Sequence, residues 1–171
     1  LLARGMRKVA IEKGVQIFEG TPVLRIQEGD PVILRTPQGT VIASKVVLAT
    51  NAWTAAIPEL RRHMIVVSSD IVATAPIPDR LSEAGWTGGE SIADCRIMVH
   101  YSHVTHDNRI SFGRGSGSLA YMGRLTTAFD GNPAKAAEVE QGLHKFYPNL
   151  ADAPITHRWG GVLGIARDWW A

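Results

Sequence analysis

Three histidines spaced three residues apart, His100, His103 and His106, are the first candidates for chemistry, because imidazole is the commonest metal ligand. Apolar and polar residues alternate around them over residues 91–115, which predicts a β-hairpin whose turn lies at residues 105–108. Successive side chains of a strand point to opposite faces, so His100 and His106 would point one way and His103 the other. We therefore predict a polar hairpin and no metal site.

A glycine-rich run, FGRGSGSLAYMG (residues 112–123), is the second candidate, because glycine loops can cradle phosphate. Gly113, Gly115 and Gly117 do not have the spacing of a dinucleotide or nucleotide loop, and neither Lys-Ser nor Lys-Thr follows them. We interpret the run as a mobile loop that follows a strand.

The composition excludes several classes of protein. The 171 residues carry 18 Lys and Arg against 16 Asp and Glu, and a net charge of +2 favours neither nucleic acid nor an anionic membrane as a partner. Cys95 is the only cysteine, so neither an intrachain disulfide nor a cysteine-based zinc site can form. This usage suits a reducing compartment, and we expect a cytoplasmic protein.

The first part of the chain reads as a helix followed by short strands. Apolar residues recur at helical spacing up to Gly14, which is a helix stop signal. Residues 15–18 read as a short strand, and residues 21–43 as an antiparallel meander with a turn at Pro37-Gln38-Gly39. Because the chain starts in helical rhythm, we expect it to be a fragment of a longer protein.

The segment VVLATNAW, residues 46–53, combines an uninterrupted apolar run with a small polar end. Such a run predicts a strand covered on both faces, as in a parallel sheet, and ligands of such sheets bind at the carboxyl ends of strands. Asn51 is one of the few non-glycine residues that tolerate a left-handed conformation, and we expect it to have a positive φ or to hold the turn with its side chain. From the pattern alone, a plain connection from strand to helix is the alternative.

The remaining residues predict a different architecture. From Met64 onward β-rich segments dominate, a single amphipathic helix is expected over residues 133–146, and a final strand over residues 153–168. The predicted fold class is α+β: a mixed, largely antiparallel sheet with helices, joined to a remnant of a Rossmann-like domain.

Three segments in this order, GTPVLRI, TPQGTVIASKVVLATNAWT and HRWGGVLGIARD, resemble the FAD-dependent amine and amino-acid oxidoreductases of the D-amino-acid oxidase-like family. The resemblance covers nearly the whole chain, with Asn51 in place of the usual Gly. The family's Gly-rich fingerprint and its C-terminal flavin-binding segment are not found. We therefore expect residues 1–60 to be part of the FAD-binding domain and residues 61–158 to be the substrate domain. In residues 159–171 the chain is expected to start its return to the FAD-binding domain.

The resemblance implies roles for individual residues. Val23 would contact the adenine end of FAD through its backbone, residues 49–51 would pass near the pyrophosphate, and another group would approach the flavin ring. The implied cofactor residues are Val23, Ala49, Thr50, Asn51, Trp53, Arg158, Trp159, Gly160 and Gly161. The resemblance also suggests His100 and Tyr101 as candidates for the amine pocket. No catalytic acid or base can be named.

One departure from the family pattern bears on the substrate. Family members that oxidise amino acids often carry an Arg after WGG, which grips the substrate carboxylate, whereas Leu163 stands there and Arg167 comes later. This favours an amine, such as a polyamine conjugate. The function expected is oxidation of a C–N bond by hydride transfer to FAD. The alternative is a non-catalytic ligand-binding or assembly module. These residues alone are not expected to retain FAD.

Overall fold

The computed structural model describes residues 2–86, 88–96, 98–125, 129 and 135–167. The chain divides into two compact units, Leu1–Leu48 and Ala49–Ala171, each described here by itself. The division lies earlier than the expected domain boundary after residue 60. The reason is that the 3₁₀ helix η1 (Asn51–Ala56) packs against the last strand of the second unit. None of the described helices is long and apolar enough to cross a bilayer.

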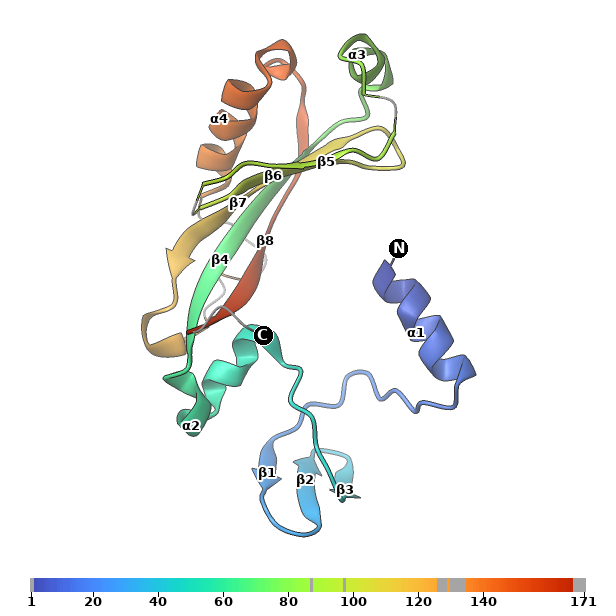
Figure 1. Ribbon diagram of the computed structural model, residues 1–171, viewed down its shortest axis with the longest axis vertical. Coiled ribbons are helices and arrows are strands. Elements are labelled where there is room, and N and C mark those ends of the chain that lie inside the picture. The colour runs from blue at the N-terminus through green and yellow to red at the C-terminus, as the bar shows by residue number, and fades with distance from the viewer. Residues whose placement is uncertain (1, 87, 97, 126–128, 130–134, 168–171) are drawn as a thin grey trace. The chain divides into compact units, whose positions relative to one another are not determined.

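The first unit holds a helix and a small sheet. Helix α1 (Leu2–Glu12) is followed by a turn at Gly14, whose φ of 84° is one that glycine adopts without strain. Strands β1 (Arg25–Gln27), β2 (Val32–Thr36) and β3 (Gly39–Ala43) pair in this order, all antiparallel (Figure 1). The predicted helix and meander are confirmed.

Two predicted strands of the first unit are wrong. Residues 15–18 and 46–49 have no regular structure, and Phe18 and Val47 are 72% and 88% exposed. A strand forms only where its backbone N–H and C=O groups find a neighbouring strand, and neither segment pairs with a strand of the described part. An apolar run indicates that a segment tends to be buried, but it does not specify which strand the segment pairs with.

The second unit is built on one five-stranded sheet in the order β5-β6-β7-β4-β8 (Figure 1). Its strands are β4 (Met64–Thr74), β5 (Ser91–Ala93), β6 (His100–Val104), β7 (Ile110–Leu119) and β8 (Ile155–Ala166). Every pairing is antiparallel. The largely antiparallel middle region is confirmed, and the described strands include no parallel pair from a Rossmann-like remnant.

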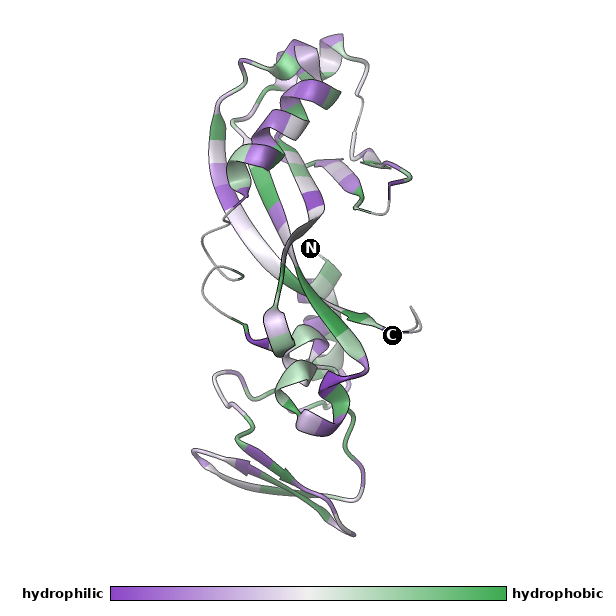
Figure 2. Cartoon of the chain, turned by 90° about the vertical axis from the view of Figure 1, so that its left-hand side faces the viewer, coloured by the Kyte–Doolittle hydropathy of each residue, from purple (hydrophilic) through white to green (hydrophobic). Residues whose placement is uncertain are grey.

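The helices of the second unit are short, apart from one. They are η1, α2 (Pro58–Arg61), α3 (Pro78–Glu83), η2 (Tyr121–Gly123), α4 (Ala136–Phe146) and η3 (Pro148–Leu150). Helix α4 confirms the predicted amphipathic helix, although residues 133 and 134, where that helix is expected to begin, lie outside the described residues. The outer side of α4 is largely hydrophilic (Figure 2). Its own residues Val139 and Leu143 are buried.

The two faces of the five-stranded sheet differ in their cover. Even-numbered residues of β4 belong to two buried clusters: Val72 packs beneath α4, and Val66 packs beneath η1. We call this side the covered face. Odd-numbered residues of β4, such as Ser69 and Ile71, lie on the other side with their cross-strand partners, and we call that side the open face.

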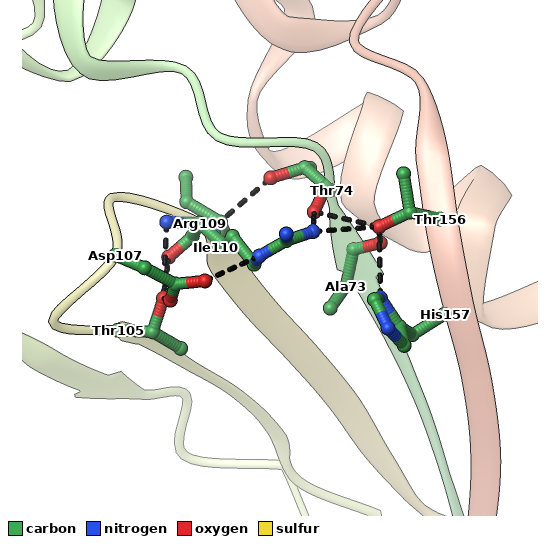
Figure 3. A network of polar contacts seen from close by, with 8 residues as sticks. All are labelled: Ala73, Thr74, Thr105, Asp107, Arg109, Ile110, Thr156 and His157. Atoms are coloured by element: carbon green, nitrogen blue, oxygen red, sulfur yellow. Dashed lines mark hydrogen bonds and ion pairs between the residues drawn. The ribbon is translucent and has the colours of Figure 1, made fainter.

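A polar network fixes the end of the sheet at the predicted hairpin turn (Figure 3). Arg109 donates to the Thr74 carbonyl at 3.0 Å, to Thr156 Oγ1 at 2.9 Å and to Asp107 at 2.6 Å. Hydrogen bonds from Thr105 and Arg109 lower the pKa of Asp107 to about 2. The turn between β6 and β7 is thereby tied to β4 and β8.

Candidate functional site

Tyr101 is the most conspicuous side chain of the open face. It leaves β6 and lies flat across β7, where a Cβ at Gly113 would come within 2.2 Å of its ring carbon Cζ. Only glycine therefore admits the ring at position 113. The hydroxyl reaches Ser69 Oγ on β4 at 2.7 Å, so one side chain spans three strands.

The sequence predicts a mobile loop for the glycine-rich run. Its residues 112–119 instead belong to strand β7, so that prediction is wrong for them.

The Ser69–Tyr101 hydroxyl pair has open space beside it. Ser69 lies opposite Gly115 of β7 and Gly161 of β8. A Cβ at Gly161 would meet no atom within 4 Å, and one at Gly115 would meet only Val99, at 3.8 Å. Burial raises the pKa of the Tyr101 phenol, so the phenol remains protonated at neutral pH. Ser69 itself is 5% exposed, so a ligand that approaches this face meets the neutral Tyr101 phenol, backed by the Ser69 hydroxyl, above a floor of glycine.

Apolar residues surround the pair. Trp159 and Leu163 of β8 lie on the same face, opposite Ile71 and Val67 of β4, and are 37% and 42% exposed. No Arg or Lys occupies a described strand position on this face. The one cation of β7, Arg114, lies opposite Asp70 on the covered face, where it donates to a glutamate of α4. These strands consequently offer no clamp for a carboxylate.

His100 lies on the other side of the sheet from its neighbour Tyr101. Its Nδ1 is 3.0 Å from Asp94 Oδ2, and its ring packs against Phe146 and Phe112, with centroids 4.9 and 5.8 Å away. Although burial raises the pKa of Asp94, hydrogen bonds from the His100 backbone and ring lower it below its usual value. The two residues predicted for the amine pocket are thus separated, and Tyr101 alone lies on the open face.

The alternation predicted for the histidines is confirmed for His100 and His103 but not for His106. His100 is buried on the covered face, and His103 is exposed on the open face, opposite Ser111. His106 lies in the turn rather than in the strand. The three imidazoles do not converge.

Asn51 has the left-handed conformation that the sequence predicts, with φ of 45°. Its Nδ2 donates to the Val162 carbonyl at 3.0 Å, and the Gly164 N–H donates to its Oδ1 at 2.8 Å. A Cβ at Gly164 would come within 3.0 Å of the Ala52 nitrogen. The asparagine thus fastens η1 directly onto β8, through a close approach that glycine permits.

The other implied cofactor residues are distributed over both units. Ala49 and Thr50 lead into η1, on which Trp53 is about half exposed. Arg158 turns to the covered face and donates to Glu140 of α4 at 2.7 Å. Val23 lies in an extended segment of the first unit. Their contacts with FAD stay predictions.

The sequence reasoning missed Ser69 and Asp70. Asp70 is 2% exposed on the covered face, its Oδ1 has no hydrogen-bond partner among the described residues, and burial raises its pKa. Arg114, opposite it on β7, likewise has a buried Nε without a partner in the described part of the chain. The signal available was Ser-Ser-Asp inside a long β run, because such a run places polar groups in the middle of a sheet.

Comparisons with known proteins agree with this architecture. The family model described as FAD dependent oxidoreductase (DAO) matches residues 1–169. The chain is 32% identical over 169 residues to the probable oxidoreductase OrdL of Rhizobium meliloti (strain 1021), covering 96% of this chain and 36% of that protein. It is 27% identical over 158 residues to gamma-glutamylputrescine oxidoreductase of Escherichia coli (strain K12), covering 90% of this chain and 35% of that protein.

A solved structure shares the fold. Glycine oxidase from Geobacillus kaustophilus superposes with a TM-score of 0.73 at 20% identity, over 99% of this chain and 43% of that one. The chain spans little more than a third of the length of the curated relatives that it matches. With a match over residues 1–169, the chain belongs to the family of FAD-dependent oxidoreductases.

Proposed function

We propose that this chain supplies the substrate-binding wall of a flavin-dependent oxidoreductase that oxidises the C–N bond of an amine. Membership of the family supports the flavin chemistry. The open face supports the position of the pocket, because it combines a hydroxyl pair, a glycine floor and exposed apolar side chains. Binding sites of small molecules commonly have such an apolar lining with few polar groups.

The choice of an amine depends on which side chains occupy the described strand positions of the open face. An α-amino acid presents a carboxylate, which proteins commonly hold with an Arg fork. The described strand positions of this face hold no Arg or Lys, and Leu163 stands where the resemblance places that Arg. The similarity to gamma-glutamylputrescine oxidoreductase supports a polyamine conjugate as the kind of amine.

The residues of the open face fit the redox end of FAD. A Cβ placed at Gly161 would have no atom within 4 Å, and Trp159 and Leu163 flank this glycine with exposed apolar surface. A flat ring would therefore lie over Gly161, between these two side chains. When bound, FAD supplies the acceptor for the hydride of the carbon beside the amine nitrogen. Asn51 and the residues before it would hold the cofactor nearer its pyrophosphate, and Val23 its adenine end.

The protein's own groups have two tasks in this proposal. The Tyr101 hydroxyl, held in place by the buried Ser69 hydroxyl, orients the amine nitrogen by a hydrogen bond. The apolar surface of Trp159 and Leu163 excludes water and thereby favours the neutral amine, which is the form able to give up hydride, because burial lowers the pKa of an amine.

Anaerobic titration of the full-length protein tests the proposal. The purified protein should carry flavin, and a mono-acylated diamine should bleach its visible absorbance. Glycine and alanine at the same concentration should leave the flavin oxidised for much longer. A colourless protein would contradict the flavin chemistry, and faster bleaching by the amino acids would contradict the choice of an amine.

A further inference from the structure

The Ser69–Tyr101 contact has a direction that matters for substrate choice. Each hydroxyl carries one proton and accepts through its lone pairs. Ser69 Oγ has two partners: Tyr101 OH at 2.7 Å and the Arg114 carbonyl at 3.4 Å. The carbonyl can only accept, so Ser69 is the donor in that second contact.

If Ser69 donates to the carbonyl, the short contact must be a hydrogen bond from Tyr101 to Ser69. Both hydroxyl protons are then used within the protein, and the Tyr101 oxygen faces a ligand with lone pairs alone. In the reverse arrangement Ser69 donates to Tyr101, the Arg114 carbonyl loses its serine partner, and the phenol proton is free. The first arrangement makes two internal hydrogen bonds and the second makes one.

We propose that Ser69 is a positioning residue that turns the Tyr101 hydroxyl into an acceptor and so selects ligands that present an N–H group over ligands that present a carboxylate. This inference rests on the proposed function, because it takes the open face as the wall of the substrate pocket. The packing supports it: Gly113 lets the ring lie flat, so the phenol oxygen cannot leave Ser69 without lifting the ring from the sheet.

Two probes that share a tert-butyl group distinguish a ligand that donates N–H groups from a ligand that presents a carboxylate. tert-Butylamine offers N–H donors and has no hydrogen on the carbon beside nitrogen, so it cannot be oxidised there, whereas pivalate offers a carboxylate on the same tert-butyl group. Each probe is titrated into the flavin-loaded full-length protein and followed by the change in flavin absorbance. We expect wild type to bind the amine more tightly, and Ser69→Ala to lower the amine-to-carboxylate affinity ratio roughly threefold to tenfold, the worth of one net hydrogen bond.

Three variants show whether the effect acts through the tyrosine. Ser68→Ala is the matched control, because Ser68 is the adjacent serine, faces the covered side, and accepts from the Ser118 N–H at 2.7 Å. It should leave the ratio unchanged. Ser69→Thr keeps the hydroxyl and should restore the ratio. In a Tyr101→Phe background Ser69→Ala should have no further effect, as a double-mutant cycle requires of residues that act together.

A second measurement does not depend on flavin or on either probe. The ionisation of Tyr101 is followed by near-ultraviolet absorbance, as the difference between each protein and its Tyr101→Phe counterpart. Once Tyr101 has ionised it can no longer donate, so Ser69 turns its proton from the Arg114 carbonyl to the phenolate and stabilises it. Ser69→Ala should therefore shift the titration to higher pH. An unmoved titration would overturn the contact, and an equal change of the ratio in Ser68→Ala would overturn the directional role. If the titration shifts but neither probe binds, the contact between Ser69 and Tyr101 exists, and both the selection of amines and the proposed function are wrong.

Discussion

The two faces of one sheet carry opposite kinds of side chain. On the covered face, Val72 is fully buried in one cluster with Leu143 of α4, and Arg114 and Arg158 each donate to a glutamate of α4. On the open face, Trp159 and Leu163 are exposed, and two neutral hydroxyls bond to one another. The same strands therefore serve stability with one set of alternating residues and offer a ligand surface with the other.

His100 and Tyr101 illustrate the difference most directly. They are adjacent in the sequence, both are polar aromatic residues, and both are candidates for the same pocket by resemblance. The pleat of β6 sends His100 into the aromatic packing beneath α4 and Tyr101 across Gly113. Substitutions on the covered face should thus change stability, and substitutions on the open face should change ligand binding. Each prediction below can break that division.

The largest expected effect is that of Leu143→Ala on stability. Leu143 is completely buried, so removal of its side chain should lower the free energy of unfolding by about 2–5 kcal/mol. The matched control is Leu119→Ala on the open face, where Leu119 is 71% exposed and the cost should stay within about 0.5 kcal/mol. Urea unfolding of the full-length protein measures both. Equal losses of stability would contradict the division between the faces.

The second effect is that of Asn51, which joins η1 to β8. Asn51→Gly removes two hydrogen bonds, each worth about 0.5–1.5 kcal/mol net, but keeps the positive φ without strain. Asn51→Val removes the same bonds and adds strain of about 1–3 kcal/mol, because a β-branched residue is an outlier at positive φ. Urea unfolding should therefore rank wild type above Gly and Gly above Val. Equal stability of the two variants would show that the backbone conformation costs nothing.

The third effect concerns binding more than stability. Gly113→Ala places a Cβ on the Tyr101 ring, which must swing away from Ser69, so affinity for the amine probe should fall roughly tenfold, the worth of about 1.4 kcal/mol. The stability cost should be near the low end of overpacking, about 1 kcal/mol, because the ring can leave the sheet. Gly115→Ala, whose Cβ would meet Val99 only at ordinary contact distance, is the control for stability and should leave the free energy of unfolding unchanged. A loss of stability without a loss of affinity would place Tyr101 among the structural residues.

Much of the second unit can be predicted because its signals are local. The turn at residues 105–108 is specified by its own polar residues, and α4 by the spacing of its apolar residues. The left-handed conformation of Asn51 is predictable because few other residue types tolerate it. Each of these properties depends on a residue and its near neighbours in the sequence.

The failures have causes that are distant in the sequence. Residues 46–49 are apolar enough for a buried strand, but strand formation needs a partner that the run cannot specify. The sequence pattern places Gly113 in a loop, whereas it is glycine because the ring of Tyr101, from another strand, occupies the place of a Cβ. Ser69 is not predicted for a similar reason, because its importance comes from the Tyr101 hydroxyl, which reaches it across β7.

The smallest expected effect is the pH dependence that Asp70 confers from within the covered face. Burial raises the pKa of Asp70 above its usual value of 3.8, so between these two values the folded state binds more protons than the unfolded state. Stability attributable to Asp70 therefore falls as pH rises through that window. Asp70→Asn cannot titrate there, and its stability relative to wild type should increase from acid to neutral pH in urea unfolding.

Asp107, in the turn between β6 and β7, should change stability with pH in the opposite direction. Its pKa is lowered to about 2, so the stability that it contributes is present above its unfolded pKa and is lost as pH falls toward the folded value. Asp107→Asn should therefore be most destabilising at neutral pH and approach wild type in acid. The two variants remove the same charge, so a general effect of net charge would move both curves in the same direction. Opposite slopes would instead show that Asp70 is a carboxylate kept in the covered face at a cost, and Asp107 one that the hairpin turn stabilises.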